Sequence, residues 1–95
     1  MVHTATVALP PAAILERAKR FFAERVPNMS AFPEKEGPQF VVLRGQGGEE
    51  LALSARALDS TDTERSAVRV STLFFDQGVA RFLSTLPLES SVEVT

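Results

Sequence analysis

Cysteine, tryptophan and tyrosine are absent from this sequence of 95 residues, and its one histidine is His3. Without cysteine the chain has no disulfide, no thiolate nucleophile and no cysteine-ligated metal. A zinc site needs three or four nitrogen, sulfur or oxygen ligands, and a catalytic triad needs a histidine beside its nucleophile. We interpret His3 as an exposed residue of a strand edge. The sequence therefore predicts no catalytic residues, no metal site and no cofactor, and the protein is not expected to be an enzyme.

Long apolar runs and a strong net charge are also missing. No stretch approaches the roughly 18 to 20 consecutive apolar residues of a membrane span, and the N-terminal residues do not resemble a signal peptide. The net charge is −2, and the only basic cluster is Arg17, Lys19, Arg20 and Arg25. We interpret this cluster as a solvated helix face, with an acidic partner or a lipid surface as the alternative. A cytoplasmic protein with no nucleic-acid partner and no transmembrane segment is expected.

Apolar residues make up 44% of the chain and charged residues 23%, which is typical of a soluble globular protein. The length suits one domain, residues 1–95, and there is no internal repeat or linker that would divide it. Residues 2–9 alternate between apolar and polar, which predicts a half-buried strand. After Pro10 and Pro11, apolar residues recur at spacings of three and four as far as Val26, which predicts an amphipathic helix of about four turns. Pro27 ends this helix.

Residues 26–38 contain three prolines and a glycine and are interpreted as a loop. Three strands are expected after it, over residues 40–43, 50–58 and about 65–75, and the glycine-rich residues 45–48 reverse the chain between the first two. Asp76 is a candidate N-cap for a second helix that ends at Pro87. Residues 90–95 could form an edge strand or a frayed tail.

These elements predict an α+β fold in the order β-α-β-β-β-α. Strands joined by short turns favour antiparallel pairing, and one apolar stripe on each helix suits packing against a sheet. We therefore expect a small antiparallel sheet of about four strands with two helices on one face. If the strand 65–75 is regular, Phe74 and Phe75 stand on opposite faces, with Phe74 on the apolar face of Val68 and Val70 and Phe75 on the other.

Most of the chain takes part in a loose resemblance to a known superfamily. A strand ending in V-A-L-P-P, the helix A-A-I-L-E-R-A-K-R-F-F and the loop V-P-N-M-S-A-F-P are similar to the start of helix-grip domains. This SRPBCC superfamily includes START domains, Bet v 1-like proteins and polyketide cyclases. The resemblance implies an antiparallel meander and a closing helix held by the sheet, here D-Q-G-V-A-R-F-L-S-T-L-P, although this chain is shorter and has fewer strands than such domains.

The resemblance implies a non-enzymatic domain that binds an apolar or amphipathic small molecule, or a lipid, between the sheet and the last helix. Ligand sites of this kind are mostly apolar with few polar anchors, and Arg56 or Arg69 would be an anchor if turned inward. The expected ligand-binding residues are Met29, Phe32, Phe40, Leu53, Val70, Phe74, Val79 and Phe82, with Met29 and Phe32 in a lid that Met29 gates. The same loop residues could instead simply complete the core.

The alternative function is protein–protein interaction, specifically homodimerisation through an exposed face or edge of the sheet. A small sheet leaves an edge strand that pairing with a second copy would cover. The apolar residues left over for such an interface are Leu58, Leu73 and Phe75. The identity of a ligand and the oligomeric state do not follow from the sequence.

Overall fold

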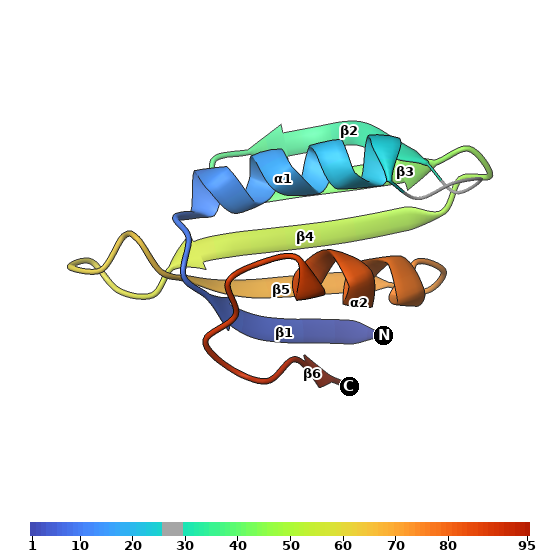
Figure 1. Ribbon diagram of the computed structural model, residues 1–95. Helices are drawn as coiled ribbons and strands as arrows, with labels where there is room; N and C mark the ends of the chain where they lie inside the picture. Colours follow the sequence, from blue (N-terminus) through green and yellow to red (C-terminus); the bar gives the residue numbers. More distant parts are fainter. Residues whose placement is uncertain (26–29) are drawn as a thin grey trace.

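The computed structural model describes residues 1–25 and 30–95 and shows an α+β fold (Figure 1). Its helices and strands follow one another along the chain as β1 (Val2–Val7), α1 (Pro11–Glu24), β2 (Ala31–Gly37), β3 (Phe40–Gly45), β4 (Glu50–Ala57), β5 (Ser66–Thr72), α2 (Asp76–Ser84) and β6 (Glu93–Val94). The predicted class, the two helices and the antiparallel pairing are confirmed. The predicted number of about four strands is wrong, because six strands form the sheet.

The two additional strands lie at the two edges of the sheet. The order is β2-β3-β4-β5-β1-β6, and all neighbours are antiparallel. Strand β2 escaped prediction because it contains Pro33 and lacks alternating apolar residues, and its register shifts between Pro33 and Lys35. Proline is tolerated at an edge or a bulge of a sheet. Strand β6 shows that part of the C-terminal segment 90–95 is an edge strand, which pairs with β1.

Both helices pack on the same face of the sheet (Figure 1). Helix α1 covers Pro11–Glu24, and its 14 residues make the predicted four turns or so, although it ends two residues before Val26. It contacts β2, β3 and β4, and α2 lies in front of β5. Every second residue of the central strands is buried beneath the helices, among them Val7, Leu43, Leu53 and Val70. Within residues 1–25 and 30–95 the opposite face of the sheet carries no helix, so the described chain forms two layers with a single core between them.

Four phenylalanine rings form the centre of that core. Phe22 of α1 lies 5.7 Å from Phe82 of α2 and 6.1 Å from Phe75, measured between ring centroids. Phe21 lies 5.4 Å from Phe82 on the outer side of the cluster. Edge-on and tilted rings at these distances attract one another in addition to the area that they bury. The cluster therefore joins both helices to each other above the sheet.

The prediction for the adjacent residues Phe74 and Phe75 is wrong in both parts. Strand β5 ends at Thr72 instead of continuing to residue 75, so strand alternation no longer decides where the two rings point. The hydroxyl of Thr72 accepts hydrogen bonds from the backbone N–H groups of Phe74 (3.3 Å) and Phe75 (3.1 Å) and so turns the chain. Phe75 is 1% exposed in the core, whereas Phe74 is 65% exposed.

These neighbours provide a matched pair of variants. We expect Phe75→Ala to lower the free energy of unfolding by about 3–5 kcal/mol, because it removes a buried ring and leaves a cavity. Phe74→Ala should change it by less than about 0.5 kcal/mol, because its ring is already in water. Urea denaturation of the two variants and the parent chain measures both values. Equal losses would contradict the observed end of β5.

Candidate functional site

The residues predicted to bind a ligand fall into two groups. Leu53, Val70, Val79 and Phe82 are each at most 1% exposed and belong to the core between the sheet and α2. Phe32, Phe40 and Phe74 are 50%, 42% and 65% exposed, so they do not join the first four. Met29, the predicted gate, lies outside the described residues. A ligand between the sheet and α2 would have to displace packed core side chains.

The two predicted polar anchors, Arg56 and Arg69, are not turned inward. Arg56 follows the buried residue Ala55 on β4 and precedes the half-buried Ala57. Arg69 stands on β5 between the buried residues Val68 and Val70. Because successive side chains of a strand point to opposite faces, both arginines belong to the face without helices. They are exposed there.

This open face is arranged in rows that the strand pairing defines. One row crosses five strands and consists of Glu93, Thr4, Arg69, Ser54 and Phe40. The adjacent row consists of Thr6, Ala67 and Arg56. Except for Phe40, Glu93 and the two arginines, the side chains in these rows are small, and Thr4, Thr6 and Ser54 carry hydroxyl groups. On this face, two long cationic side chains therefore stand among shorter ones.

A hollow of about 840 Å³ lies over these rows. Residues from four strands and two loops line it, namely Thr4, Ala5, Thr6, Gln39, Ser54, Arg56, Ala67, Val68, Arg69, Ser90, Ser91 and Glu93. The C-terminal segment forms one wall, because Ser90 is fixed to β1 by the backbone N–H of Thr6, which donates to Ser90 Oγ at 2.9 Å. The volume is within the range of small-molecule sites in proteins.

Arg44, on the same face, has a different electrostatic environment. Its guanidinium lies 2.6 Å from a carboxylate oxygen of Glu34 and 3.1 Å from one of Glu50, and it donates to the carbonyl oxygen of Gly48. The hydrogen bond with Glu34 is the main reason why the pKa of Arg44 is raised above its usual value. Within residues 1–25 and 30–95, neither Arg56 nor Arg69 has a carboxylate within 4.0 Å.

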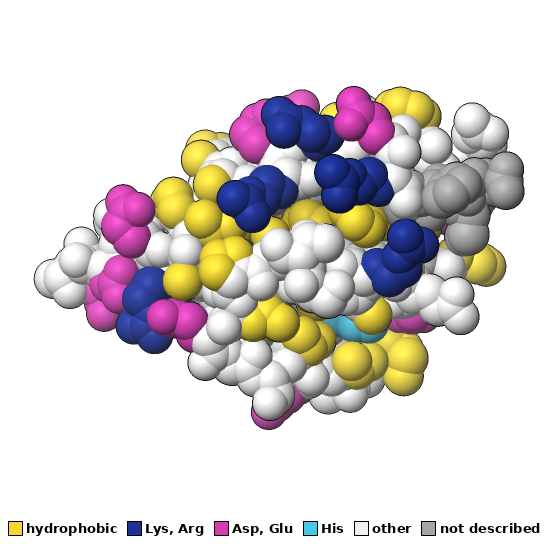
Figure 2. Space-filling model, in the orientation of Figure 1, with side chains coloured by type: hydrophobic (Ala, Val, Ile, Leu, Met, Phe, Trp, Pro, Cys, Tyr) yellow, Lys and Arg dark blue, Asp and Glu magenta, His cyan; other side chains and the backbone are white. Residues whose placement is uncertain are grey.

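The basic cluster of α1 lies on the helix-bearing face, where Figure 2 shows dark blue side chains over α1 and beside α2. Arg17, Arg20 and Arg25 surround a hollow of about 250 Å³ with Phe21 and Phe82 at its base. Lys19 does not join them, because its ammonium group lies 2.8 Å from Glu16 and 2.9 Å from Glu36. This hollow is small and lies on the face opposite to Arg56 and Arg69.

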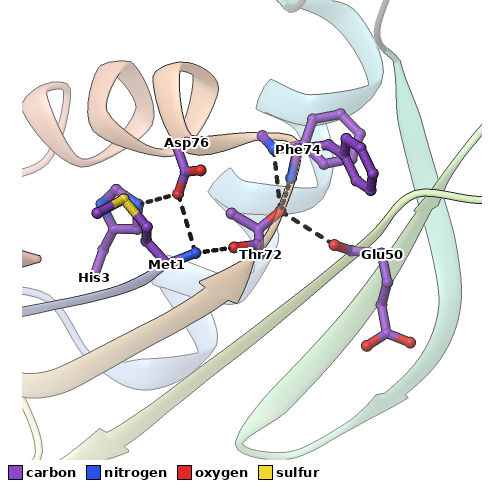
Figure 3. A network of polar contacts seen from close by, with 7 residues as sticks. Met1, His3, Glu50, Thr72, Phe74 and Asp76 are labelled. Carbon is purple, nitrogen blue, oxygen red and sulfur yellow. Dashed lines mark hydrogen bonds and ion pairs between the residues drawn. The ribbon is translucent and has the colours of Figure 1, made fainter. Parts of the chain in front are cut away.

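His3 is buried and is not the exposed edge residue that the sequence suggested. It is 3% exposed, and its Nε2 donates a hydrogen bond of 2.9 Å to Oδ1 of Asp76, as Figure 3 shows. The amino group of Met1 lies 3.5 Å from the same oxygen. His3 shares the parity of Ala5 and Val7 in the alternating strand, and that signal could have placed it inside. Asp76 is the first residue of α2, one position after the N-cap Phe75.

The contacts of this network have a structural role. Asp76 is at a helix N-terminus, where a negative charge is favoured, and His3 connects it to β1. Thr72 carries a hydroxyl beside this network. That hydroxyl donates to the carbonyl oxygen of Glu50 at 3.2 Å and accepts hydrogen bonds from two backbone N–H groups (Figure 3). Its proton is therefore engaged with a backbone oxygen and not directed at the imidazole. The network fastens the start of α2 to β1 and β4.

Comparisons with known proteins add no relative: no family model, no curated protein and no solved structure matches this chain. The similarity to helix-grip domains stays a prediction. Among the described residues, no helix is long and apolar enough to cross a membrane. The same part of the chain contains no group of three or more histidine, aspartate or glutamate side chains placed to hold a metal ion.

The link between His3 and Asp76 predicts a particular dependence of stability on pH. The hydrogen bond from His3, with a smaller contribution from the amino group of Met1, holds the pKa of Asp76 below its usual 3.8. Because the pKa is lower in the folded state, the interaction stabilises the fold above pH 3.8 and is lost as the pH falls through the folded-state value. Between about pH 5 and about pH 2, the parent chain should lose more stability than Asp76→Asn.

Urea denaturation at a series of pH values measures this difference. Glu24→Gln, which removes an exposed carboxylate from α1, is the control and should keep the acid dependence of the parent chain. If Asp76→Asn lost as much stability in acid as the parent chain, the assigned role of Asp76 would be wrong.

Proposed function

We propose that this protein is a non-enzymatic domain that binds an amphipathic small molecule on the open face of its sheet. The observation that carries the proposal is the hollow over β1, β5 and β4, with two arginines that lack carboxylate partners in the described structure. A ligand can enter this hollow from solvent, and the packed core need not change. The sequence pointed to the other face, between the sheet and α2, where the described side chains fill the space with one another.

The composition of the hollow supports an amphipathic ligand. Ala67 and the stems of the arginines offer apolar contact within the hollow. The guanidinium and hydroxyl groups supply polar contacts that fix orientation. The succession of strand, helix, meander and closing helix is in keeping with the helix-grip resemblance. The lack of cysteine suits a reducing compartment and supports a cytoplasmic location.

Filling the hollow tests this function. Ser54 is exposed and lines the hollow, so Ser54→Phe should place a ring in the binding volume without disturbing the core. We expect this change to weaken binding of the amphipathic probe anilinonaphthalene sulfonate about tenfold, equivalent to about 1.4 kcal/mol. Isothermal titration calorimetry measures the affinity, and native mass spectrometry of the purified protein detects any ligand already bound.

Thr63→Phe is the matched control, because it adds the same ring at an exposed position of the loop between β4 and β5. It should bind the probe like the parent chain. If the probe binds Ser54→Phe and the parent chain equally, the open face is not the binding site.

Homodimerisation is the second candidate function, and one observation favours it. Leu73 and Phe74 follow each other at the end of β5 and are 81% and 65% exposed, more than any other large apolar side chain in residues 1–25 and 30–95. Met1 lies beside them around a second hollow. The interface predicted from Leu58, Leu73 and Phe75 needs correction, because Phe75 is a core residue. A second copy of the chain would cover Leu73 and Phe74.

Sedimentation analysis over a range of concentrations tests the dimer. We expect the parent chain to associate and the double variant Leu73→Ser with Phe74→Ser to stay monomeric, because the contact area would lose both anchors. Leu58→Ser is the control: Leu58 is also exposed, but it follows Ala57, which pairs with Ser66 at the opposite end of β5 from Leu73, so it drops out of the predicted interface. A parent chain that is monomeric at every concentration would exclude this second function.

A further inference from the structure

We infer that the ligand of the open face carries a phosphate monoester group, which Arg56 and Arg69 hold between them. This inference rests on the proposed function and specifies the chemical class of the ligand. Its starting point is that the two arginines are neighbours in the sheet. Arg69 pairs with Ser54, and Arg56 is two residues further along β4 on the same face. Diagonal neighbours of this kind lie roughly 7–8 Å apart, so one group can contact both guanidinium ends.

The electrostatic argument comes from the contrast with Arg44. Two like charges on diagonal neighbours repel one another, and an arginine normally gains from a carboxylate partner. The chain provides Arg44 with two such partners, Glu34 and Glu50. On the described face it provides none within 4.0 Å for Arg56 or Arg69, although both line the hollow. An anion between them would neutralise both charges and remove their mutual repulsion.

The number of donors favours a phosphate over a carboxylate. Each guanidinium presents several N–H donors in a fork that matches two oxygens of a phosphate. The hydroxyls of Thr4 and Ser54 flank Arg69 in the same row. Ser90 accepts from the backbone of Thr6, so its own proton is free to donate. A carboxylate has two oxygens and one charge, whereas a phosphate monoester has three free oxygens and about −1.5 to −2 charges at neutral pH.

Glu93 sets the orientation of the ligand. It is the carboxylate that lines the hollow, and it pairs with Thr4, so it lies two strands from Arg69 in the same row. A phosphate next to Glu93 would be repelled, whereas one between Arg56 and Arg69 is separated from it by β1. The ester substituent then extends from the phosphate over Ala67 or along the row toward Phe40. Removing the negative charge of Glu93 should strengthen phosphate binding.

Titration with phenyl phosphate, followed by two-dimensional amide NMR spectra of the full chain, tests the inference. Phenol is the neutral probe, and inorganic phosphate is the probe without an ester substituent. We expect phenyl phosphate to shift the amide signals of Thr4, Ser54 and Ala67 and to bind more tightly than either comparison probe. Arg56→Gln and Arg69→Gln should each weaken it about tenfold or more, as expected for loss of a charged hydrogen-bond partner. Glu93→Gln should bind it more tightly.

Arg17→Gln is the matched control, because it removes the same charge from the helix-bearing face. A selective loss in Arg56→Gln and Arg69→Gln, with Arg17→Gln unchanged, supports the site. If all three variants lost affinity equally, the effect would come from net charge alone, and the proposed phosphate site would be wrong. Equal affinity for inorganic phosphate and phenyl phosphate would overturn the assignment to an ester.

Failure of this inference is distinguishable from failure of the proposed function. If phenol and phenyl phosphate shift the same open-face amides with equal affinity, and the arginine variants bind both normally, the phosphate inference is wrong and the binding site stands. If phenyl phosphate and anilinonaphthalene sulfonate both leave the amides of Thr4, Ser54 and Ala67 unmoved, both proposals are wrong.

Discussion

The aromatic cluster of Phe21, Phe22, Phe75 and Phe82 is the contact on which the rest of the structure depends. It fills the space between the sheet and the two helices, and it joins α1 and α2, which are far apart in the sequence. A chain of this length buries one core and has little apolar surface for another. Because this cluster uses that capacity on one face, the other face of the sheet remains open to solvent.

The position of Phe75 in the cluster depends in turn on where β5 ends. The hydroxyl of Thr72 binds the backbone N–H groups of the next residues and directs Phe75 inward. Asp76 follows at once, and its carboxylate accepts from the buried ring of His3. Three successive features therefore fix the start of α2 against β1 and β5: a strand end, a core ring and a polar link. The same turn leaves Leu73 and Phe74 in water, so the strand end that completes the core also creates the most exposed apolar pair of the described chain.

Periodicity predicted much of this fold, and it failed where polar contacts or edge pairing decide the structure. The helix of four turns, the strands β3 and β4 and the antiparallel meander followed from alternation and from spacings of three and four. Strand β2 did not, because its side chains are mostly exposed and its backbone pairing with β3 leaves no apolar pattern. The end of β5 depends on one threonine hydroxyl, and a regular alternation cannot show it.

The candidate site was even less predictable, for a related reason. Alternation divides the side chains of β4 and β5 into two sets on opposite faces of the sheet. Only the apolar character of one set indicates which face the helices cover. The predicted ligand residues Leu53, Val70 and Phe82 were selected because they are apolar, and that same property placed them in packed contacts. The residues that line the hollow are mostly small or polar. They come from separate strands and from the C-terminal segment, which the pairing of β6 with β1 brings next to the sheet.

Strand alternation also separates the proposed site from the core that supports it. Arg69 lies between Val68 and Val70, and Arg56 follows Ala55, so each binding residue adjoins buried residues that anchor its strand. The backbone under the hollow is therefore held by core packing on the reverse side, while the side chains that face the hollow carry little of that packing. Such an arrangement keeps the guanidinium groups on a rigid support, which lowers the cost of ordering a site when a ligand binds. It also lets residues of the open face change without loss of the fold, which is why substitutions there can measure binding separately from stability.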